Sequence, residues 1–449
     1  MKKIFQYIML AVVTIVMASC TSDIEETTAT TGKNNVQLVV GEFPAFGDSQ
    51  TRAIGTPDEG KTSWAEGDEL ILEIAKTSYG RHSATFTYNG KSWELTSGEL
   101  VYLEGDPAYI PHVYYAPNYK WEAGKLVLKE GKDPGTDEYI EGNARITGNS
   151  ETITVSFAEA TRKYSRLRIA TLPNEQITVD TEYFTPAGSS DMEQEGNYTL
   201  TSDEKGNAYL YGTFENNSEV TVKYREAALT TYTFSQATES AKSYALDATV
   251  ISANSSEEIK SAIEQKVADG KTTIRLNLAP NAGTNEFMAI REAIKGAAPN
   301  DLGTIELTII GVETIPEEAF YKMLQLKSVR MSDVKEIKKY AFKECQYLTV
   351  VEAPSLNKLC SGAFKKCDQL SKLTFGPINY ADARNWPIFE YITPNIDLIL
   401  SDYQKEMIET DSYLYTANND RDYAGSDEHN SKNFLGREFR SITCRYKVK

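Results

Sequence analysis

IPEEAFYKMLQL at residues 315–326, IKKYAFKECQYL at residues 337–348 and LCSGAFKKCDQL at residues 359–370 are three versions of one pattern. Successive copies lie 22 residues apart, and an Ala-Phe pair occupies the same place in each. A period in this range is typical of stacked repeats. One such unit is too small to bury its own apolar face, so neighbouring units must share a core. The sequence therefore predicts a solenoid of stacked coils over about residues 304–375.

Two rows of side chains are expected inside this stack. Phe320, Phe342 and Phe364 recur at the Ala-Phe position, and we expect their rings to stack in the interior. Cys345 and Cys367 share a later register, where the first copy has methionine. Buried thiols behave as small apolar groups, so both are expected to fill the core. A disulfide between them is geometrically possible but is not implied.

The pattern Ile-x-x-x-Ala-Phe-x-x-Cys-x-x-Leu, complete at residues 337–348, carries a resemblance. It resembles the leucine-rich repeats of the Bacteroides-type and treponemal surface-antigen class. This implies an α/β leucine-rich repeat solenoid, which we assign to residues 250–449 together with its caps. A capping box at Ser255 and Glu258 opens a predicted helix, and a second helix is expected over residues 285–295. Such stacks expose a long ladder of side chains and bind macromolecules more often than they catalyse reactions.

Short runs of alternating apolar and polar side chains fill the chain between residues 36 and 249 and are typical of β-strands. Asn89-Gly90 joins two of these runs and is a strong hairpin signal. Alternate positions are too polar for buried parallel strands, so two antiparallel β-sandwiches are expected. We place them at residues 36–145 and 146–249. The fold class is therefore mostly β, with helices expected only in the cap of the solenoid.

The N-terminus has the features of a secretory signal. Lys2 and Lys3 precede a mostly apolar run over residues 4–16, which is too short to span a membrane. Residues 17–20, Met-Ala-Ser-Cys, resemble the lipobox of bacterial lipoproteins. This resemblance implies a signal peptide at residues 1–19, a lipid attached to Cys20 and a tether over residues 20–35. An ordinary signal peptide with a chance cysteine is the alternative.

A second resemblance rests on four short motifs that follow in order: Thr51-Arg52-Ala53, Trp64-Ala65-Glu66-Gly67-Asp68, Tyr88-Asn89-Gly90-Lys91-Ser92-Trp93 and Tyr114-Tyr115-Ala116-Pro117. Together they resemble the fimbrillin-like lipoproteins of Bacteroides-type bacteria. The resemblance implies two transthyretin-like sandwiches and a role as a pilus subunit or a related surface lipoprotein. It also implies that Arg52 is a candidate protease maturation site, where cleavage would free residues 36–46 and open a groove for another subunit's strand. The alternative is an exposed loop arginine in a lipoprotein that never polymerises.

The charge and the histidine count narrow the classes of function. The chain has 47 basic and 64 acidic residues, a net charge of −17, and no basic patch stands out, which disfavours nucleic acid as a partner. Its three histidines, His82, His112 and His429, lie in different regions. No nucleophile–base pair and no metal cluster can be assembled from such a pattern. We therefore expect no enzyme activity, no metal and no cofactor.

These patterns together predict a lipid-anchored adhesin at the outer membrane and cell surface, either free-standing or as a tip or accessory subunit of a pilus. Its repeat domain would bind a host or bacterial surface protein or a glycan, and pilus subunits would join it by β-strand addition. The alternative is a glycan-binding surface lipoprotein of a nutrient-uptake system. Exposed aromatic residues on the sandwiches would favour that alternative, and the tryptophans to inspect are Trp64, Trp93, Trp121 and Trp386.

Overall fold

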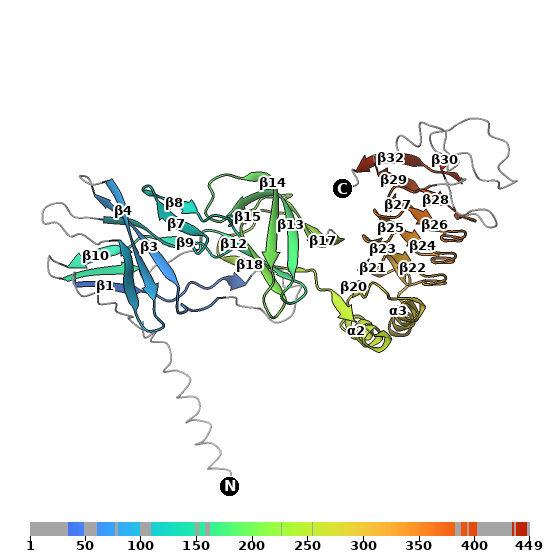
Figure 1. Ribbon diagram of the computed structural model, residues 1–449, viewed down its shortest axis with the longest axis horizontal. Helices are drawn as coiled ribbons and strands as arrows, with labels where there is room; N and C mark the ends of the chain where they lie inside the picture. Colours follow the sequence, from blue (N-terminus) through green and yellow to red (C-terminus); the bar gives the residue numbers. More distant parts are fainter. Residues whose placement is uncertain are drawn as a thin grey trace, which may run out of the picture.

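Strands dominate the computed structural model, in which two β-rich units and a repeat stack follow one another along the chain (Figure 1). The structure describes residues 35–48, 61–76, 80–98, 109–148, 152–157, 162–225, 227–253, 255–381, 388–392, 395–401, 433–434 and 437–446. Two helices occur within these ranges. Neither is long and apolar enough to cross a membrane.

The repeat stack is built on a sheet in which every neighbouring pair of strands is parallel. Its strands, in spatial order, are β19 (Ile251–Ala253), β20 (Thr273–Leu278), β21 (Ile305–Ile310), β23 (Leu326–Met331), β25 (Val350–Ala353), β27 (Lys372–Phe375), β29 (Asp397–Ser401) and β32 (Ser441–Tyr446). A second parallel sheet lines another side of the stack with two-residue strands: β22 (Thr314–Ile315), β24 (Glu336–Ile337), β26 (Lys358–Leu359) and β28 (Tyr380–Ala381). The solenoid predicted from the 22-residue period is confirmed. A short hairpin, β30 (Asn433–Phe434) with β31 (Arg437–Glu438), precedes the last strand.

Aromatic rings form a continuous row through the interior of this stack. The ring of Phe342 lies 5.1 Å from that of Phe320 and 5.4 Å from that of Phe364, with interplanar angles of 17° and 7°. Phe389 extends the row at 5.7 Å and 9°. Each coil therefore places one ring directly against the ring of the next coil, so the hydrophobic core runs the length of the stack.

Two helices cover the first end of the stack. Helix α2 (Ser256–Ala268) begins after Ser255, whose side chain accepts a hydrogen bond from the backbone N–H of Glu258. Helix α3 (Thr284–Ala297) places Phe287 edge-on against Phe320 at 5.6 Å. Arg291 on the same helix donates to the carbonyl oxygen of Glu318. The cap therefore covers the end of the row of rings. It also provides a hydrogen-bond donor for the carbonyl oxygen of Glu318 in the first coil, which has no preceding coil of the same kind beside it.

The first β-rich unit contains two sheets and a hairpin. One sheet has the order β5 (Trp93–Gly98), β4 (Gly80–Tyr88), β3 (Glu69–Lys76), β6 (Tyr109–Tyr115), β9 (Ile140–Gly142), and the other the order β1 (Asn35–Val40), β11 (Thr152–Phe157), β10 (Arg145–Gly148). Leu38, Val155 and Phe157 from the small sheet share one core with Leu72 and Phe86 from the large one. The hairpin pairs β7 (Tyr119–Glu122) with β8 (Lys125–Leu128).

The second unit is organised around one long, bent strand. Its strand order is β17 (Ala227–Thr233), β16 (Glu219–Tyr224), β13 (Gln176–Pro186), β15 (Asn207–Phe214), β12 (Ser165–Ala170), β18 (Lys242–Asp247), β2 (Gly47–Asp48), and β14 (Glu193–Thr201) also pairs with β13. The first half of β13 pairs with β16 and its end pairs with β15. Tyr183, with a φ of 51°, lies between these two halves. This left-handed residue turns the strand from one set of partners to the other.

Two features of the β-rich units differ from the sequence-based expectation. Strands β10 and β11 belong to the first unit, so that unit extends to Phe157 and passes the expected boundary near residue 145. The sheets are also mixed, because β1 pairs with β11 in parallel and β18 pairs with both β12 and β2 in parallel. Alternating polarity reports which side of a strand is buried and carries no information on the direction of its neighbour.

Candidate binding surfaces

The segment from β1 to β2 links the two β-rich units. Strand β1 is the edge of its sheet, and β2 is the edge of the sheet in the second unit. Leu38 and Val40 on β1, and Phe43 between β1 and β2, are buried in the hydrophobic core of the first unit. Residues 36–46, the predicted leaving strand, therefore lie in this linking segment, with backbone pairing on one side and apolar burial on one face.

Arg162 fixes the middle of this segment. Its Nε donates to the carbonyl oxygen of Pro44 at 2.8 Å, and its guanidinium carbon lies 3.8 Å from the centre of the Phe46 ring. The two terminal nitrogens of the guanidinium bind both carboxylate oxygens of Glu138. The side chains of Arg162 and Glu138 are only 2% and 5% exposed, so the pair is desolvated as well as bidentate.

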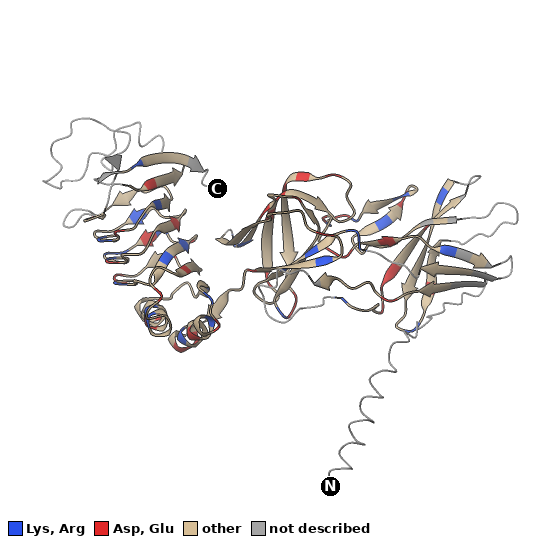
Figure 2. Cartoon of the chain, turned by 180° about the vertical axis from the view of Figure 1, so that it is seen from behind, with Lys and Arg blue, Asp and Glu red and all other residues tan. Residues whose placement is uncertain are grey.

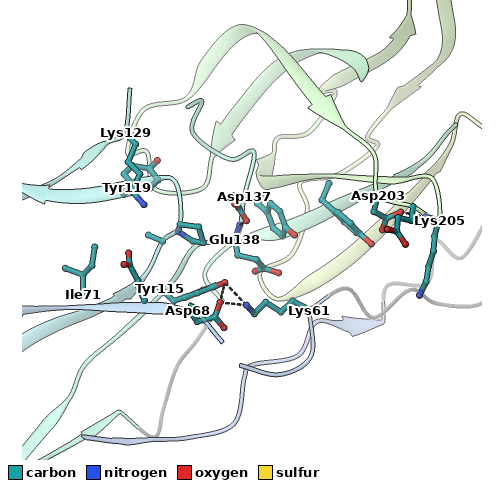
Figure 3. A pocket seen from close by; sticks show the side chains of 17 residues that line it. Lys61, Asp68, Ile71, Tyr115, Tyr119, Lys129, Asp137, Glu138, Asp203 and Lys205 are labelled. Atoms are coloured by element: carbon teal, nitrogen blue, oxygen red, sulfur yellow. Dashed lines mark hydrogen bonds and ion pairs between the residues drawn. The ribbon is translucent and has the colours of Figure 1, made fainter. Parts of the chain in front are cut away.

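A cavity of about 760 Å³ lies beside this junction and is lined from both β-rich units. Figure 3 shows Lys61 directed at Asp68 and Tyr115. The Lys61 Nζ lies 2.5 Å from a carboxylate oxygen of Asp68 and 2.9 Å from the Tyr115 hydroxyl, which itself donates to Asp68. Burial, followed by the charge of Asp68, raises the pKa of Tyr115 above its ordinary value, so the hydroxyl stays protonated.

Acidic side chains outnumber lysines around this cavity. Among them, desolvation raises the pKa of Asp137, while the backbone N–H of Glu138 and the nearby lysines oppose the rise. Asp68 is held by Lys61, and Glu138 by Arg162. Across the described part of the chain, no three His, Cys, Asp or Glu side chains gather closely enough to hold a metal ion. The cavity is a polar space suited to hydrogen bonding.

Salt bridges between neighbouring coils run along the two sheets of the repeat stack. Lys327 binds Glu306 at 2.8 Å on the long sheet, and Arg330 binds Glu352 at 2.9 Å. On the short-strand side, Lys335 binds Glu313 at 2.5 Å and Lys358 binds Glu336 at 2.7 Å. Figure 2 shows basic and acidic segments following one another along the stack. These pairs leave little net charge on either sheet.

The beginning of the long sheet is covered by the second β-rich unit. Arg275 on β20 donates to the carbonyl oxygen of Leu229 on β17 at 2.6 Å, and its guanidinium lies 3.9 Å from Asp247. Ile310, at the end of β21, belongs to the hydrophobic core of the second unit. The part of this sheet that is open to a partner therefore starts at β23.

The structure places the predicted repeat-core residues inside the stack. Phe320, Phe342, Phe364, Cys345 and Cys367 all have 0% exposure. The thiols of Cys345 and Cys367 are free and donate to the carbonyl oxygens of the phenylalanines one coil earlier, both at 3.0 Å. Burial raises the pKa of Cys345 to about 12, so this thiol stays protonated at neutral pH.

The remaining predicted residues fall in several places. Cys20 and Arg52 lie outside the described residues, as do Trp386 and His429. Trp93 is fully buried, and Trp64 packs edge-on against it at 5.2 Å. These two tryptophans are part of a core and offer no flat exposed platform. The sequence did not indicate the Arg162–Glu138 pair, because neither residue belongs to a recognisable motif and they come together only where the segments before β9 and β12 meet.

Three comparisons relate these features to known proteins. Residues 302–409 match the family described as BspA type leucine rich repeat region, in six copies. The C-terminal part of the chain carries BspA-type repeats. A solved structure of a candidate cell adhesion protein from Bacteroides fragilis NCTC 9343 aligns with 49% of this chain and 93% of its own, at 10% identity and a TM-score of 0.26. No curated protein sequence matches the chain.

The BspA-type repeats extend beyond the three copies evident from the 22-residue period. The match continues to residue 409, whereas the clear period ends near residue 375. In the next coil Phe389 takes the ring position, after Ile388 in place of alanine and 25 residues after Phe364. A changed spacing and a lost alanine conceal this coil from a search for a fixed period.

Proposed function

We propose that this chain is an adhesin that is lipid-anchored at Cys20 in the outer membrane and binds a host or bacterial macromolecule at the cell surface through its BspA-type repeats. The observation that supports this most directly is the repeat stack itself, which presents a long open surface from β23 onward. In this proposal the two β-rich units act as a stalk, joined to the stack through Arg275 and Ile310. The protein acts by binding and needs neither a cofactor nor a catalytic group.

Adhesion by whole cells tests this proposal. Bacteria that display the chain are expected to adhere to host cells, to surfaces coated with host matrix proteins or to partner bacteria, and the purified chain should compete. A Cys20→Ser variant should leave the surface and lose adhesion, while a Cys360→Ser variant serves as the matched control. Normal surface display without adhesion to any of these targets would overturn the proposal.

A tip or accessory position in a pilus is the more specific form of this proposal. It is supported by the segment from β1 to β2, an edge strand whose loss would uncover the apolar sites of Leu38, Val40 and Phe43. An Arg-specific protease acting on the folded chain should then cleave after Arg52 and leave a product that accepts a strand from another subunit. The Arg52→Ala chain should resist. Resistance of the native chain at Arg52 would contradict maturation while leaving adhesion untouched.

Capture of a glycan for nutrient uptake is a second candidate, and the cavity between the β-rich units is the observation that favours it. Tyr209 and Tyr211 line this cavity and stack on one another at 6.3 Å. Aromatic faces beside carboxylates suit sugar rings and their hydroxyl groups. A glycan array would test this idea, with Tyr209→Ala expected to abolish any hit that occupies the cavity. A hit that survives this substitution would place the sugar elsewhere.

A further inference from the structure

A third side of the repeat stack, distinct from its two sheets, is made by the turns around each Ala-Phe pair. We call it the turn face and define it by residues 317–322, 338–344 and 360–366. Its coils are held in register by backbone hydrogen bonds: the N–H of Lys322 donates to Lys343, and the N–H of Glu344 to Lys365. Side chains of successive coils therefore form straight rows, about 5 Å apart from one coil to the next.

Lysine is in excess on the turn face, which has six lysines and three glutamates. Two of the glutamates, Glu317 and Glu318, lie in the first coil, so the excess is concentrated in the second and third coils. Lys338, Lys339 and Lys366 have no carboxylate within ion-pair distance among the residues that the structure describes. The other three turn-face lysines are paired: Lys322 and Lys343 with Glu344, and Lys365 with Glu390. On the two sheets, by contrast, Lys327, Lys335 and Lys358 each bind a glutamate of a neighbouring coil. A chain with a net charge of −17 thus carries one local cationic surface.

Tyrosine rings hold three of the turn-face lysines in place, namely Lys322, Lys339 and Lys343. The Lys343 ammonium lies between two rings, 5.1 Å from the centre of Tyr321 and 4.7 Å from that of Tyr340. Lys339 lies 4.8 Å from the same Tyr340 ring, and Lys322 lies 5.1 Å from Tyr321. Cation–π contacts of this kind order the side chains and leave ammonium hydrogens for another ligand. Less freedom is then lost when an anion binds.

Gly362 makes room for this arrangement. It has a φ of +64°, and a Cβ atom built at this position would lie 2.4 Å from Cε1 of Tyr340. The ring of Tyr340 therefore lies directly over the backbone of the following coil. Nearby on helix α3, Arg291 and Lys295 donate to the carbonyl oxygens of Glu318 and Tyr321 in the first coil. Two cations of the helical cap therefore lie beside the turn face.

We propose that the turn face binds a linear acidic polysaccharide, whose sulfate or carboxylate groups rest on Lys338, Lys339, Lys343 and Lys366. This inference rests on the proposed role of the repeats as a binding surface and names the partner class. Lys338, Lys339 and Lys343 lie in the second coil, and Lys366 lies in the third, one coil or about 5 Å further along. Cations on two neighbouring coils suit a polymer whose anionic groups recur along its length. The acidic remainder of the molecule repels the polymer elsewhere and confines it to this side.

The contacts of the turn face also distinguish between classes of anionic polymer. Backbone N–H groups of Phe320, Lys322, Glu344 and Lys366 are all used between coils, so an acidic peptide finds few main-chain donors to pair with. The faces of Tyr321 and Tyr340 are occupied by lysine, so they are not free to stack on the bases of a single-stranded nucleic acid. A polysaccharide needs neither free main-chain donors nor free aromatic faces, since point charges and hydroxyl groups suffice for its recognition.

Binding to the whole chain in detergent tests this inference by calorimetry or surface plasmon resonance. The probes are heparin for sulfate, hyaluronan for carboxylate, neutral dextran, polyglutamate and single-stranded DNA. We expect saturable binding of heparin or hyaluronan that weakens as salt is added, and no binding of dextran. The test variant replaces four turn-face lysines with glutamine: Lys338, Lys339, Lys343 and Lys366. The matched control replaces four lysines of the two sheets: Lys327, Lys335, Lys358 and Lys372.

The turn-face variant should bind the acidic polysaccharide about tenfold more weakly, since exposed ion pairs each contribute little. The sheet variant should bind as the parent does, and equal melting temperatures would show that both fold. Absence of polysaccharide binding, equal weakening in both variants, or tighter binding of polyglutamate or DNA would each overturn the inference. Adhesion that persists in bacteria carrying the turn-face variant would reject this inference alone. Polysaccharide binding by a chain that supports no adhesion would instead reject the proposed function.

Discussion

The rings of Phe342 and Phe364 lie parallel to within 7°, with their centres 5.4 Å apart, inside the repeat stack. Each ring belongs to a different coil, so the contact couples the coils through their side chains as well as through the parallel sheets. Phe342 also contacts Phe320 on its other side. Phe342 is therefore the ring whose removal interrupts the row in the middle.

Replacing Phe342 with alanine should lower the free energy of unfolding of the repeat stack by about 3–5 kcal/mol, because it leaves a cavity between two rings. Phe342→Leu keeps most of the apolar volume and should lower it by less than about 1.5 kcal/mol. Differential scanning calorimetry of the whole chain would measure both variants against the parent. An alanine variant that melts together with the parent would show that the row does not support the stack.

The buried thiols should be chemically silent in the folded chain. Cys345, with a pKa of about 12, and Cys367 should resist alkylation by iodoacetamide at mildly alkaline pH, whereas the half-buried Cys360 should react. All three should react in denaturant, which is the control. Mass spectrometry of the peptides would measure the extent of alkylation at each cysteine. Alkylation of Cys345 at the same rate as Cys360 would contradict the burial of Cys345.

The raised pKa of Cys345 predicts that the folded chain loses stability at high pH. The pKa of Cys345 is raised in the folded state above its ordinary value of 9.0, so the folded chain prefers the protonated thiol. This contribution is fully present below pH 9 and is lost as the pH rises toward 12. A Cys345→Ala chain, although less stable at neutral pH, should lose less stability over that interval. Parallel pH profiles of the two chains would contradict the assignment.

At the far end of the stack, Asp397 should titrate at unusually low pH. Hydrogen bonds from Arg440 and Ser441 hold its pKa at about 2, below the ordinary 3.8. A depressed pKa of this kind stabilises the folded state above pH 4 and ceases to do so as the pH falls through 2. Carbon-detected NMR of the side-chain carboxyl should show this titration, and Arg440→Gln should move it upward. An unchanged titration in that variant would exclude Arg440 as the cause.

Much of the repeat stack was predictable because its information is local and periodic. The Ala-Phe spacing indicated the row of Phe320, Phe342 and Phe364, and Ser255 with Glu258 indicated the start of helix α2. The turn face was not predicted, although its lysines are visible in the sequence. The excess of lysine on the turn face becomes apparent only in the structure, which shows that glutamates of the two sheets form ion pairs with lysines of the sheets.

The β-rich units were harder to predict because their pairing is non-local. Strand β1 pairs with β11, more than a hundred residues later, and in parallel. Nothing in the alternation of residues 36–40 specifies that partner or its direction. The contact of Arg162 with Pro44 and Glu138 similarly joins three separate segments. Contacts of this kind follow from topology, which patterns of neighbouring residues do not encode.

Arg162 and Glu138 provide the last prediction, which concerns the junction of the two β-rich units. Arg162→Met should lower the free energy of unfolding of this junction by about 3–5 kcal/mol, because Glu138 is then a buried carboxylate without a cation. Combining Arg162→Met with Glu138→Leu should recover much of that loss, since apolar side chains often replace a buried ion pair at little cost. Urea unfolding followed by tryptophan fluorescence is suitable, because Trp64 and Trp93 both lie in the first unit. If the double variant were no more stable than Arg162→Met alone, the loss would come from the contacts of Arg162 with Pro44 and Phe46 rather than from the unpaired charge.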